Sequence, residues 1–185
     1  AILIECGELI DHIGWKWWKK QDMNLPQAQI ELVDIWHFFL SREMEHADDV
    51  GMNLDELAEA IIDEMQEKAT NGAAASTFII ESARSLAKHA AGNEIPFWVV
   101  STLCRRLGMS HDDLFRMYVG KAALNLFRYE NGYQDGSYIK TWMGREDNVY
   151  LEEILASGVT DLDTILGLLA EHYEDVKLAA REVSQ

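Results

Sequence analysis

Four acidic residues with a repeated spacing are the side chains of this sequence best suited to chemistry. Glu31 and Asp34 lie three residues apart in the segment 30–40, where eight of the eleven residues are apolar. Glu5 and Glu8 repeat that spacing upstream. Residues three apart share one face of a helix, and ionised carboxylates in an apolar segment are costly unless a cation neutralises them. Two helices that bring these pairs together would form a site for Mg²⁺.

A second polar group follows one face of a later predicted helix. Lys121, Asn125 and Arg128 are spaced i, i+4 and i+7, among mostly apolar neighbours. Two cations and an amide in file complement a phosphate chain and a polar edge, because Arg offers a planar fork and Lys a point charge. The following segment is rich in glycine and aromatic residues and is expected to be a loop that folds over a ligand; its polar members include Tyr133, Lys140, Arg145 and Asn148.

Each pattern also has an ordinary structural explanation. Glu-x-x-Glu pairs occur on solvated helix faces, and a stripe such as that of Lys121 also forms rows of ion pairs. The aromatic residues Trp15, Trp17 and Phe38 suit a core or an interface as well as a stacked base. We interpret His12 and His37 as structural histidines.

A di-iron site is a rival reading of the metal chemistry. Asp34-x-x-His37 and Glu43-x-x-His46 resemble the Glu-x-x-His ligands of di-iron bundles. Those bundles take the two motifs from separate helices, whereas here both fall on one predicted helix. The sequence therefore favours carboxylate ligands alone.

Length, charge and cysteine content narrow the class of protein. The 185 residues suit one domain that spans the whole chain. A net charge of −16 argues against a nucleic-acid polymer as partner, since phosphate backbones are bound by Lys and Arg. The two isolated cysteines indicate neither a zinc site nor a disulfide framework and favour a cytoplasmic setting. No apolar run approaches the ~18 residues of a membrane span.

Apolar periodicity and capping signals predict an all-α fold. Gly14 and Gly92 are expected to end helices, Pro96 to begin one, and Asn53 to cap another. The box Thr160 to Asp163 is expected to cap the last helix. The predicted helices are 1–13, 26–46, 54–69 (stopped by Asn71-Gly72), 73–91, 96–107, 111–130 (capped by the box Ser110 to Asp113), 149–156 and 161–183, with an irregular segment at 131–148.

Taken together, these motifs resemble the all-α dimeric dUTP nucleotidohydrolases (dUTPases), part of a wider superfamily of all-α nucleoside triphosphate pyrophosphatases. The similarity runs from residue 5 to about residue 150 and is weak between about 47 and 95. The paired acids occur throughout the superfamily, whereas the motifs of the second half are specific to the dimeric dUTPases. The matching motifs are Glu5-x-x-Glu8, Trp15-Lys-Trp-Trp-Lys19, Glu31-Leu-Val-Asp-Ile-Trp-His-Phe38, Lys121-x-x-x-Asn125-x-x-Arg128, Asn131-Gly-Tyr133 and Gly136-x-Tyr138-x-Lys140-x-Trp142-x-Gly-x-Glu-Asp-Asn148.

The resemblance implies Mg²⁺-dependent hydrolysis of dUTP, and also of dUDP, to dUMP by a homodimer with two or more ions per site. It implies that the metal ligands and catalytic residues are Glu5, Glu8, Glu31 and Asp34, with Glu5 orienting or deprotonating the attacking water. It also implies that Lys121 and Arg128 contact phosphates and that Asn125 reads the uracil edge. Trp17 and Phe38 would pack around the base, Tyr133 would lie near the deoxyribose, and Lys140 and Asn148 would close over the phosphates.

The sequence also departs from the family, whose members carry a further helix with a uracil-recognising glutamine before the first acid pair. Helical periodicity is under way from Ala1, so we expect an upstream segment that this sequence does not include. Two alternatives stay open. One is a sister pyrophosphatase that acts on dCTP or on several dNTPs. The other is a non-enzymatic acidic helical scaffold, which has no use for the stripe of Lys121, Asn125 and Arg128.

Overall fold

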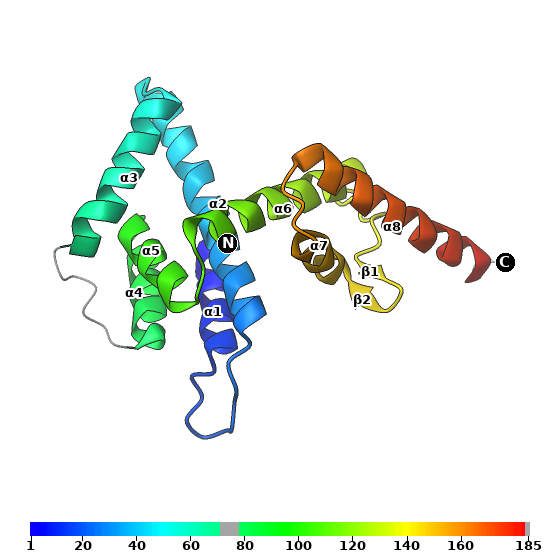
Figure 1. The fold of residues 1–185 in the computed structure, drawn as a ribbon, viewed down its shortest axis with the longest axis horizontal. Helices are drawn as coiled ribbons and strands as arrows, with labels where there is room; N and C mark the ends of the chain where they lie inside the picture. Colours follow the sequence, from blue (N-terminus) through cyan, green and yellow to red (C-terminus); the bar gives the residue numbers. More distant parts are fainter. Residues whose placement is uncertain (71–77, 184–185) are drawn as a thin grey trace. The chain divides into compact units, whose positions relative to one another are not determined.

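The computed structural model describes residues 1–70 and 78–183, with helices in eight segments and one short hairpin (Figure 1). Most of the described residues are helical, so the prediction of an all-α fold is confirmed. The chain divides into two compact units, residues 1–114 and 115–185, which are described separately below. That the whole chain forms one catalytic domain stays a prediction. No helix of the described residues is long and apolar enough to cross a membrane.

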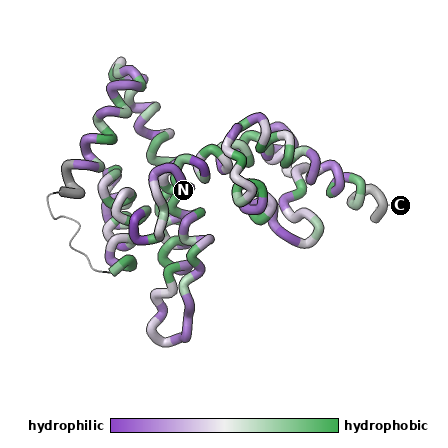
Figure 2. The backbone as a smooth tube through the Cα atoms, viewed as in Figure 1, coloured by the Kyte–Doolittle hydropathy of each residue, from purple (hydrophilic) through white to green (hydrophobic). Residues whose placement is uncertain are grey.

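The first unit is built around a pair of neighbouring helices. Helix α1 packs most extensively against α2 and also contacts α4, while α5 contacts α2, α3 and α4. In Figure 2, hydrophobic and hydrophilic stretches alternate along these helices, as expected where one face of each helix is buried. The helices are α1 (Ile2–Ile13), α2 (Leu25–Val50), α3 (Leu54–Thr70), α4 (Ile79–Ala91) and α5 (Phe97–Arg106).

The contact between α1 and α2 follows from their apolar spacing. Cys6, Leu9 and Ile13 are the buried residues of α1, at i, i+3 and i+7. Gly14 then ends α1 in the left-handed conformation, at φ 81°, which costs glycine no steric strain. This packing sets the faces of α1 and α2 against each other, and the acidic pairs of the sequence lie on these two helices.

Most predicted boundaries of the first unit are confirmed, with two differences. The capping box at Asn53 is present, since its Oδ1 accepts a hydrogen bond from the amide of Glu56 at 2.9 Å. Helix α2 continues past the predicted end at His46 to Val50. Helix α4 begins at Ile79 and not at 73, because Phe78 is extended (φ −110°, ψ 133°). Positions 71–77, with the predicted Asn71-Gly72 stop, lie outside the described residues.

The second unit combines helices with a hairpin. Helix α6 begins at the predicted Ser110 cap, where Ser110 Oγ accepts from the amide of Asp113 at 3.1 Å. Strands β1 and β2 pair antiparallel through the turn Met143-Gly144, whose residues both have positive φ, as a type I′ turn requires. The elements are α6 (His111–Glu130), β1 (Thr141–Trp142), β2 (Arg145–Glu146), α7 (Asp147–Ala156) and α8 (Leu162–Val183).

Two sequence predictions for the second unit need correction. The segment 131–148 contains the β1–β2 hairpin and the start of α7, which begins two residues before the predicted 149. The cap of α8 is Asp161 and not Thr160, since Asp161 Oδ2 accepts hydrogen bonds from the amide and the hydroxyl of Thr164 at 2.9 and 2.7 Å. The carboxylate reaches the third residue of the turn, as an N-cap side chain does.

An aromatic core holds the second unit together. Trp142 is fully buried, and its indole N–H donates to the carbonyl of Ile139 at 2.8 Å. A Cβ at Gly120 of α6 would lie 2.7 Å from a methyl carbon of Leu155, so glycine allows α7 to approach closely. The aromatic members of this core are Phe127, Tyr138, Trp142, Tyr150 and Tyr173.

Candidate functional site

Three of the four predicted carboxylates come together where α1 faces α2. Oxygen atoms of Glu5, Glu8 and Glu31 lie within 4.8 Å of one another, close enough for one metal ion to contact all three. Glu8 is exposed, Glu5 is half-buried and Glu31 is buried. The i, i+3 spacing on α1 and the packing of α1 on α2 therefore bring together three of the four carboxylates that the sequence predicted for this site.

Burial and like charge act together on Glu31. Its residue exposure is only 6%. Burial first, and then the negative charges of Glu8 and Asp34 and a hydrogen bond with Glu5, together raise the pKa of the Glu31 carboxyl to about 8. A carboxyl group surrounded by three others binds a proton, or a cation, in preference to carrying its own charge. This electrostatic environment is typical of functional sites.

Asp34 lies at the edge of this cluster. It is half-buried on α2 and contributes to the raised pKa of Glu31, so its charge is near. Its oxygens do not belong to the group of three that lie within 4.8 Å. The structure thus assembles Glu5, Glu8 and Glu31 directly, and the role of Asp34 as a fourth ligand stays a prediction.

His12 belongs to the same region, although the sequence indicated only a structural histidine there. Its Nε2 lies 3.6 Å from Glu31 Oε1, one turn of α1 beyond Glu8. Its imidazole faces a buried carboxylate and is partly exposed. The spacing from Glu8 to His12, i to i+4 on a helix, is the sequence signal for this neighbour.

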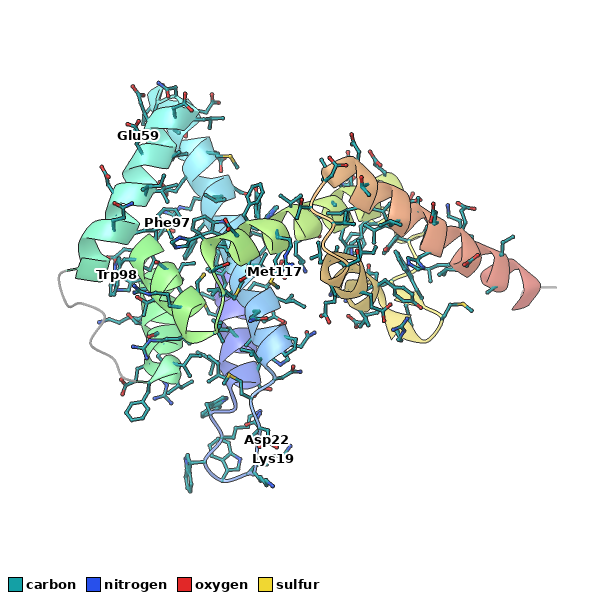
Figure 3. All side chains as sticks on the ribbon, in the orientation of Figure 1. Lys19, Asp22, Glu59, Phe97, Trp98 and Met117 are labelled. Atoms are coloured by element: carbon teal, nitrogen blue, oxygen red, sulfur yellow. The ribbon has the colours of Figure 1, made fainter. Side chains whose placement is uncertain are left out.

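The aromatic residues near the acids occupy two different settings. Trp17 lies on the loop between α1 and α2, which Figure 3 marks with Lys19 and Asp22, and it is 89% exposed. It contacts Trp18 edge to face, with ring centroids 5.7 Å apart, and Trp18 contacts Trp15 in the same way at 5.1 Å. Phe38 is half-buried on α2. Their packing around a base stays a prediction.

The second predicted group lies within the second unit, where Arg128 is firmly held. Its Nε and Nη2 each donate to a different oxygen of Asp147 at 2.8 Å, a bidentate ion pair. Asp147 is completely buried, and the side chain of Arg128 is 12% exposed. Contact with Asp147 raises the pKa of Arg128 against the effect of burial, so the guanidinium stays charged. The charge that the sequence assigned to a ligand is already matched by a carboxylate.

The neighbours of Arg128 complete a polar network. Arg128 Nη1 donates to Asn125 Oδ1 at 3.4 Å, and Asn125 is exposed. Lys121 is buried, and its Nζ donates to Asn148 Oδ1 at 3.4 Å. The predicted stripe of α6 is thus connected to the start of α7.

The remaining two predicted contacts lie on the surface of the second unit. Tyr133 is exposed, with its ring centroid 5.8 Å from the guanidinium carbon of Arg128. Lys140 Nζ lies 3.4 Å from Glu146 Oε2 in an exposed ion pair. Both positions are open to a ligand, and their roles stay predictions.

Sequence reasoning assigned no role to three residues that organise this network. They are Asp147, Tyr138 and Tyr173, of which the first two fall within motifs quoted above. An acid close to several aromatic residues was the available signal, because a buried carboxylate needs a cation. The spacing of residues in the sequence did not indicate which Lys or Arg would pair with Asp147.

Comparison with known protein families identifies the family of this chain. A family model described as dUTPase matches residues 1–133. The chain therefore belongs to the all-α dimeric dUTPase family, and its enzymatic activity is that of a dUTP diphosphatase. Enzymes of this family are generally metal-dependent. A search for similar curated proteins returned no significant match.

The family match covers only part of the predicted site. It includes the carboxylate cluster and the residues of the α6 stripe, from Lys121 to Arg128, and it ends at Tyr133. Lys140, Asp147 and Asn148 follow it. Their roles therefore depend on the structure and on the resemblance of the later motifs.

Proposed function

We propose that the protein hydrolyses dUTP, and also dUDP, to dUMP with Mg²⁺, and that dUTP releases pyrophosphate. This activity would limit uracil in DNA and supply dUMP. The observation that carries the proposal is the approach of Glu5, Glu8 and Glu31 to within 4.8 Å of one another, in a protein whose family hydrolyses dUTP.

The residues of the cluster fit Mg²⁺. Carboxylate oxygens are the ligands that this small, hard cation prefers, and it commonly uses one or two carboxylates together with substrate phosphates. The pKa of Glu31 is raised first by burial and then by the negative charges of Glu8 and Asp34, which repel its ionised form. A divalent cation offsets that repulsion. The resemblance to the family supports two or more ions, with Asp34 as the fourth ligand.

The carboxylates have two different roles in this proposal. Some bind the metal ion, and one orients or deprotonates the attacking water. When bound, Mg²⁺ supplies an acidified water and a counter-charge for the phosphates. Glu8, Glu31 and Asp34 hold position and charge, and Glu5 orients the attacking water or accepts its proton. Glu5 suits this role because it is half-buried, between the exposed Glu8 and the buried Glu31.

The remaining substrate contacts of this proposal follow from the resemblance to the family. Lys121 and Arg128 attract the phosphates, and Lys121 carries more of that attraction because Asp147 offsets the charge of Arg128. Asn125 is exposed and offers an amide to the uracil edge. The other proposed contacts are Trp17 and Phe38 for the base, Tyr133 for the deoxyribose, and Lys140 and Asn148 for the phosphates.

We further propose a cytoplasmic homodimer, as the resemblance implies. Large apolar side chains are exposed near the connection of α2 to α3, a surface that suits association; they are Met44, Val50, Met52, Leu54 and Ile62. Both cysteines are free and buried, which suits a reducing compartment. Sedimentation equilibrium tests the dimer, and a monomer at micromolar concentration would contradict it.

The test of the proposed reaction is product release from five nucleotides. The enzyme is incubated with dUTP, dUDP, dCTP, dTTP or UTP, first with Mg²⁺ and then with EDTA, and dUMP, pyrophosphate and phosphate are measured. We expect dUTP to yield dUMP and pyrophosphate, dUDP to yield dUMP and phosphate, and EDTA to stop both. Turnover that persists in EDTA would reject the metal assignment. Turnover of dCTP equal to that of dUTP would instead support the alternative, a sister pyrophosphatase that acts on dCTP or on several dNTPs.

A further inference from the structure

Asp147 is a buried acceptor whose hydrogen-bonding capacity is fully used. Its Oδ2 accepts from Arg128 Nε and from the hydroxyl of Tyr138, each at 2.8 Å. Its Oδ1 accepts from Arg128 Nη2 at 2.8 Å and from the amide of Asn148 at 2.9 Å. With no exposed surface and four donors, Asp147 is inaccessible to a ligand. Asp147 can therefore affect a bound molecule only indirectly, through the side chains to which it is hydrogen-bonded.

The support for Asp147 reaches back to the last helix. The ring of Tyr138 stacks on that of Tyr173 from α8, with centroids 5.1 Å apart and an interplanar angle of 28°. Tyr173 is itself fixed, because its hydroxyl accepts from the amide of Ile139 at 2.9 Å. All of these residues follow Tyr133, where the family match ends. The chain beyond the family match therefore orders a residue inside it, Arg128.

Arg128 in turn sets the orientation of the Asn125 amide. The ion pair with Asp147 fixes the plane of the guanidinium, and its Nη1 donates to Asn125 Oδ1 at 3.4 Å. The oxygen and nitrogen of an amide branch from one carbon at about 120°, so an oxygen held by Arg128 directs the NH₂ group away from it. Asn125 is exposed, which leaves this NH₂ as the donor offered to a ligand.

An asparagine that can rotate accepts either pyrimidine edge. Uracil and thymine carry a carbonyl oxygen at position 4, an acceptor, whereas cytosine carries an amino group, a donor. A free amide presents its NH₂ to the first and, after a half-turn, its oxygen to the second. An amide held with NH₂ outward matches only the carbonyl and meets the cytosine amino group donor to donor. Sites built on one hydrogen-bonding pattern reject the other because a buried polar group is left unpaired.

We propose that Asp147 and Tyr138 are positioning residues that fix Arg128, and through it the Asn125 amide, so that the enzyme selects a 4-carbonyl pyrimidine over a 4-amino pyrimidine. The inference rests on the proposed contact between Asn125 and the base. It assigns the discrimination between dUTP and dCTP to a network that the substrate does not touch.

The first test replaces Asp147 by Asn and compares three nucleotides. Asp147→Asn keeps the volume but removes the charge that holds Arg128, so the Asn125 amide regains its rotation. We expect the ratio of kcat/KM for dUTP to that for dCTP to fall by about tenfold, the scale of one hydrogen bond. The ratio of dUTP to dTTP should not change, since both bases carry the 4-carbonyl. A fall in both ratios, or in neither, would overturn the proposal.

A matched pair of tyrosine variants controls for lost stability. Tyr138→Phe removes the hydroxyl that bonds to Asp147, whereas Tyr150→Phe removes one from the same aromatic core that donates to the carbonyl of Trp142 at 3.0 Å. The two residues are similarly buried, at 9% and 7% exposure. We expect Tyr138→Phe to lower the dUTP to dCTP ratio about threefold and Tyr150→Phe to leave it unchanged. Equal ratios in the two variants would refute the role of the network, even if Asp147→Asn does not fold.

A binding measurement separates this inference from the proposed reaction. Isothermal titration of dUMP and dCMP to the wild-type enzyme and to the two tyrosine variants requires no turnover. If the wild-type enzyme fails to hydrolyse dUTP with Mg²⁺, the proposed function fails, and the preference for dUMP still tests the network. A preference for dUMP that is the same in the wild type and in Tyr138→Phe would contradict the inference while leaving the hydrolysis intact.

Discussion

The two units of this protein handle buried charge in opposite ways. In the first, Glu5, Glu8 and Glu31 gather like charges within 4.8 Å, and the pKa of Glu31 rises to about 8. In the second, Arg128 and Asp147 pair opposite charges with two hydrogen bonds of 2.8 Å. Each arrangement joins two helices: α1 and α2 in the first unit, and α6 and α7 in the second. Only the first leaves an electrostatic need that a bound cation can meet.

The difference predicts different roles for the two groups. The carboxylate cluster is expected to bind a cation, and the Arg128–Asp147 pair is expected to hold neighbouring side chains in position. An uncompensated cluster stores repulsion that is relieved when a cation binds, so loss of one member harms activity more than folding. A pair of opposite charges contains no repulsion to relieve, so loss of one partner leaves the other charge buried and unpaired, which destabilises the fold. The same type of substitution is therefore expected to have opposite consequences in the two units.

The largest expected effect comes from Glu31→Gln. The substitution removes a proposed metal ligand, and turnover of dUTP should fall by roughly 1,000-fold or more. The metal-free variant should unfold at the same temperature as the wild type or higher, because the wild type must take up a proton on Glu31 as it folds at neutral pH, whereas glutamine needs none. Steady-state kinetics with Mg²⁺ and thermal denaturation in EDTA measure the two quantities. Near-normal turnover would reject the metal assignment.

Glu59→Gln is the matched control for this variant. Glu59 is exposed on α3, outside the carboxylate cluster (Figure 3), and the change in charge is identical. Its turnover and melting temperature should match those of the wild type. A loss of activity in both variants would mean that net charge, and not the cluster, controls the rate.

Arg128→Ala should act mainly on folding. It leaves Asp147 buried without its cation, and breaking a buried pair in this way costs about 3–5 kcal/mol of unfolding free energy. Arg128→Leu combined with Asp147→Leu should recover part of that loss, because no lone charge remains. Urea denaturation of the single and double variants tests the expectation. An unchanged midpoint in Arg128→Ala would show that the pair contributes nothing.

An exposed ion pair of the same unit provides the comparison. Arg145 Nη1 pairs with Glu153 Oε1, and both side chains are about half exposed. Arg145→Ala should cost less than about 1 kcal/mol, since water and salt screen such pairs. A loss as large as that of Arg128→Ala would remove the distinction between buried and exposed pairs.

The metal-free enzyme should lose stability as the pH rises. The folded protein holds the Glu31 proton up to about pH 8, whereas the unfolded chain releases it near the ordinary glutamate pKa of about 4.5. Because the pKa is raised in the folded state, the stability contributed by this proton is complete below the unfolded pKa and is lost as the pH rises through 8. Melting temperatures in EDTA from pH 5 to 9 should fall more steeply for the wild type than for Glu31→Gln, and added Mg²⁺ should flatten the wild-type curve. Parallel curves for the two proteins would refute the raised pKa.

The carboxylate cluster could be predicted from sequence because its cause is local. Two i, i+3 pairs on adjacent amphipathic helices bring acids together once the apolar faces of the helices are buried, as Leu9 of α1 and Phe39 of α2 are. Helix positions and most caps followed from the same short-range rules. The exceptions, such as Asp161 in place of Thr160, the later start of α4 and the longer α2, lie at helix ends, where such rules are weakest.

The network around Arg128 could not be predicted in the same way. Spacing on α6 correctly placed Lys121, Asn125 and Arg128 in one stripe, but not the partner that Arg128 would take. Asp147 lies 19 residues later, beyond a hairpin whose turn depends on Met143 adopting a positive φ. Long-range pairing of this kind is set by tertiary packing, so a ligand-binding arginine and a paired one look alike in the sequence.

The smallest expected effect concerns the histidine beside the cluster. His12 Nε2 lies 3.6 Å from Glu31 Oε1, and His12→Gln would exchange the imidazole for an amide of similar reach. Loss of the imidazole changes the contact that orients the Glu31 carboxyl, so we expect the Mg²⁺ concentration for half-maximal activity to change by about twofold to fivefold, with kcat little affected. His46→Gln, on the exposed surface of α2, is the control and should leave both values unchanged. If His12→Gln behaves like His46→Gln, the imidazole contributes nothing to the cluster, and the contrast between the two units is sharper than the structure alone indicates.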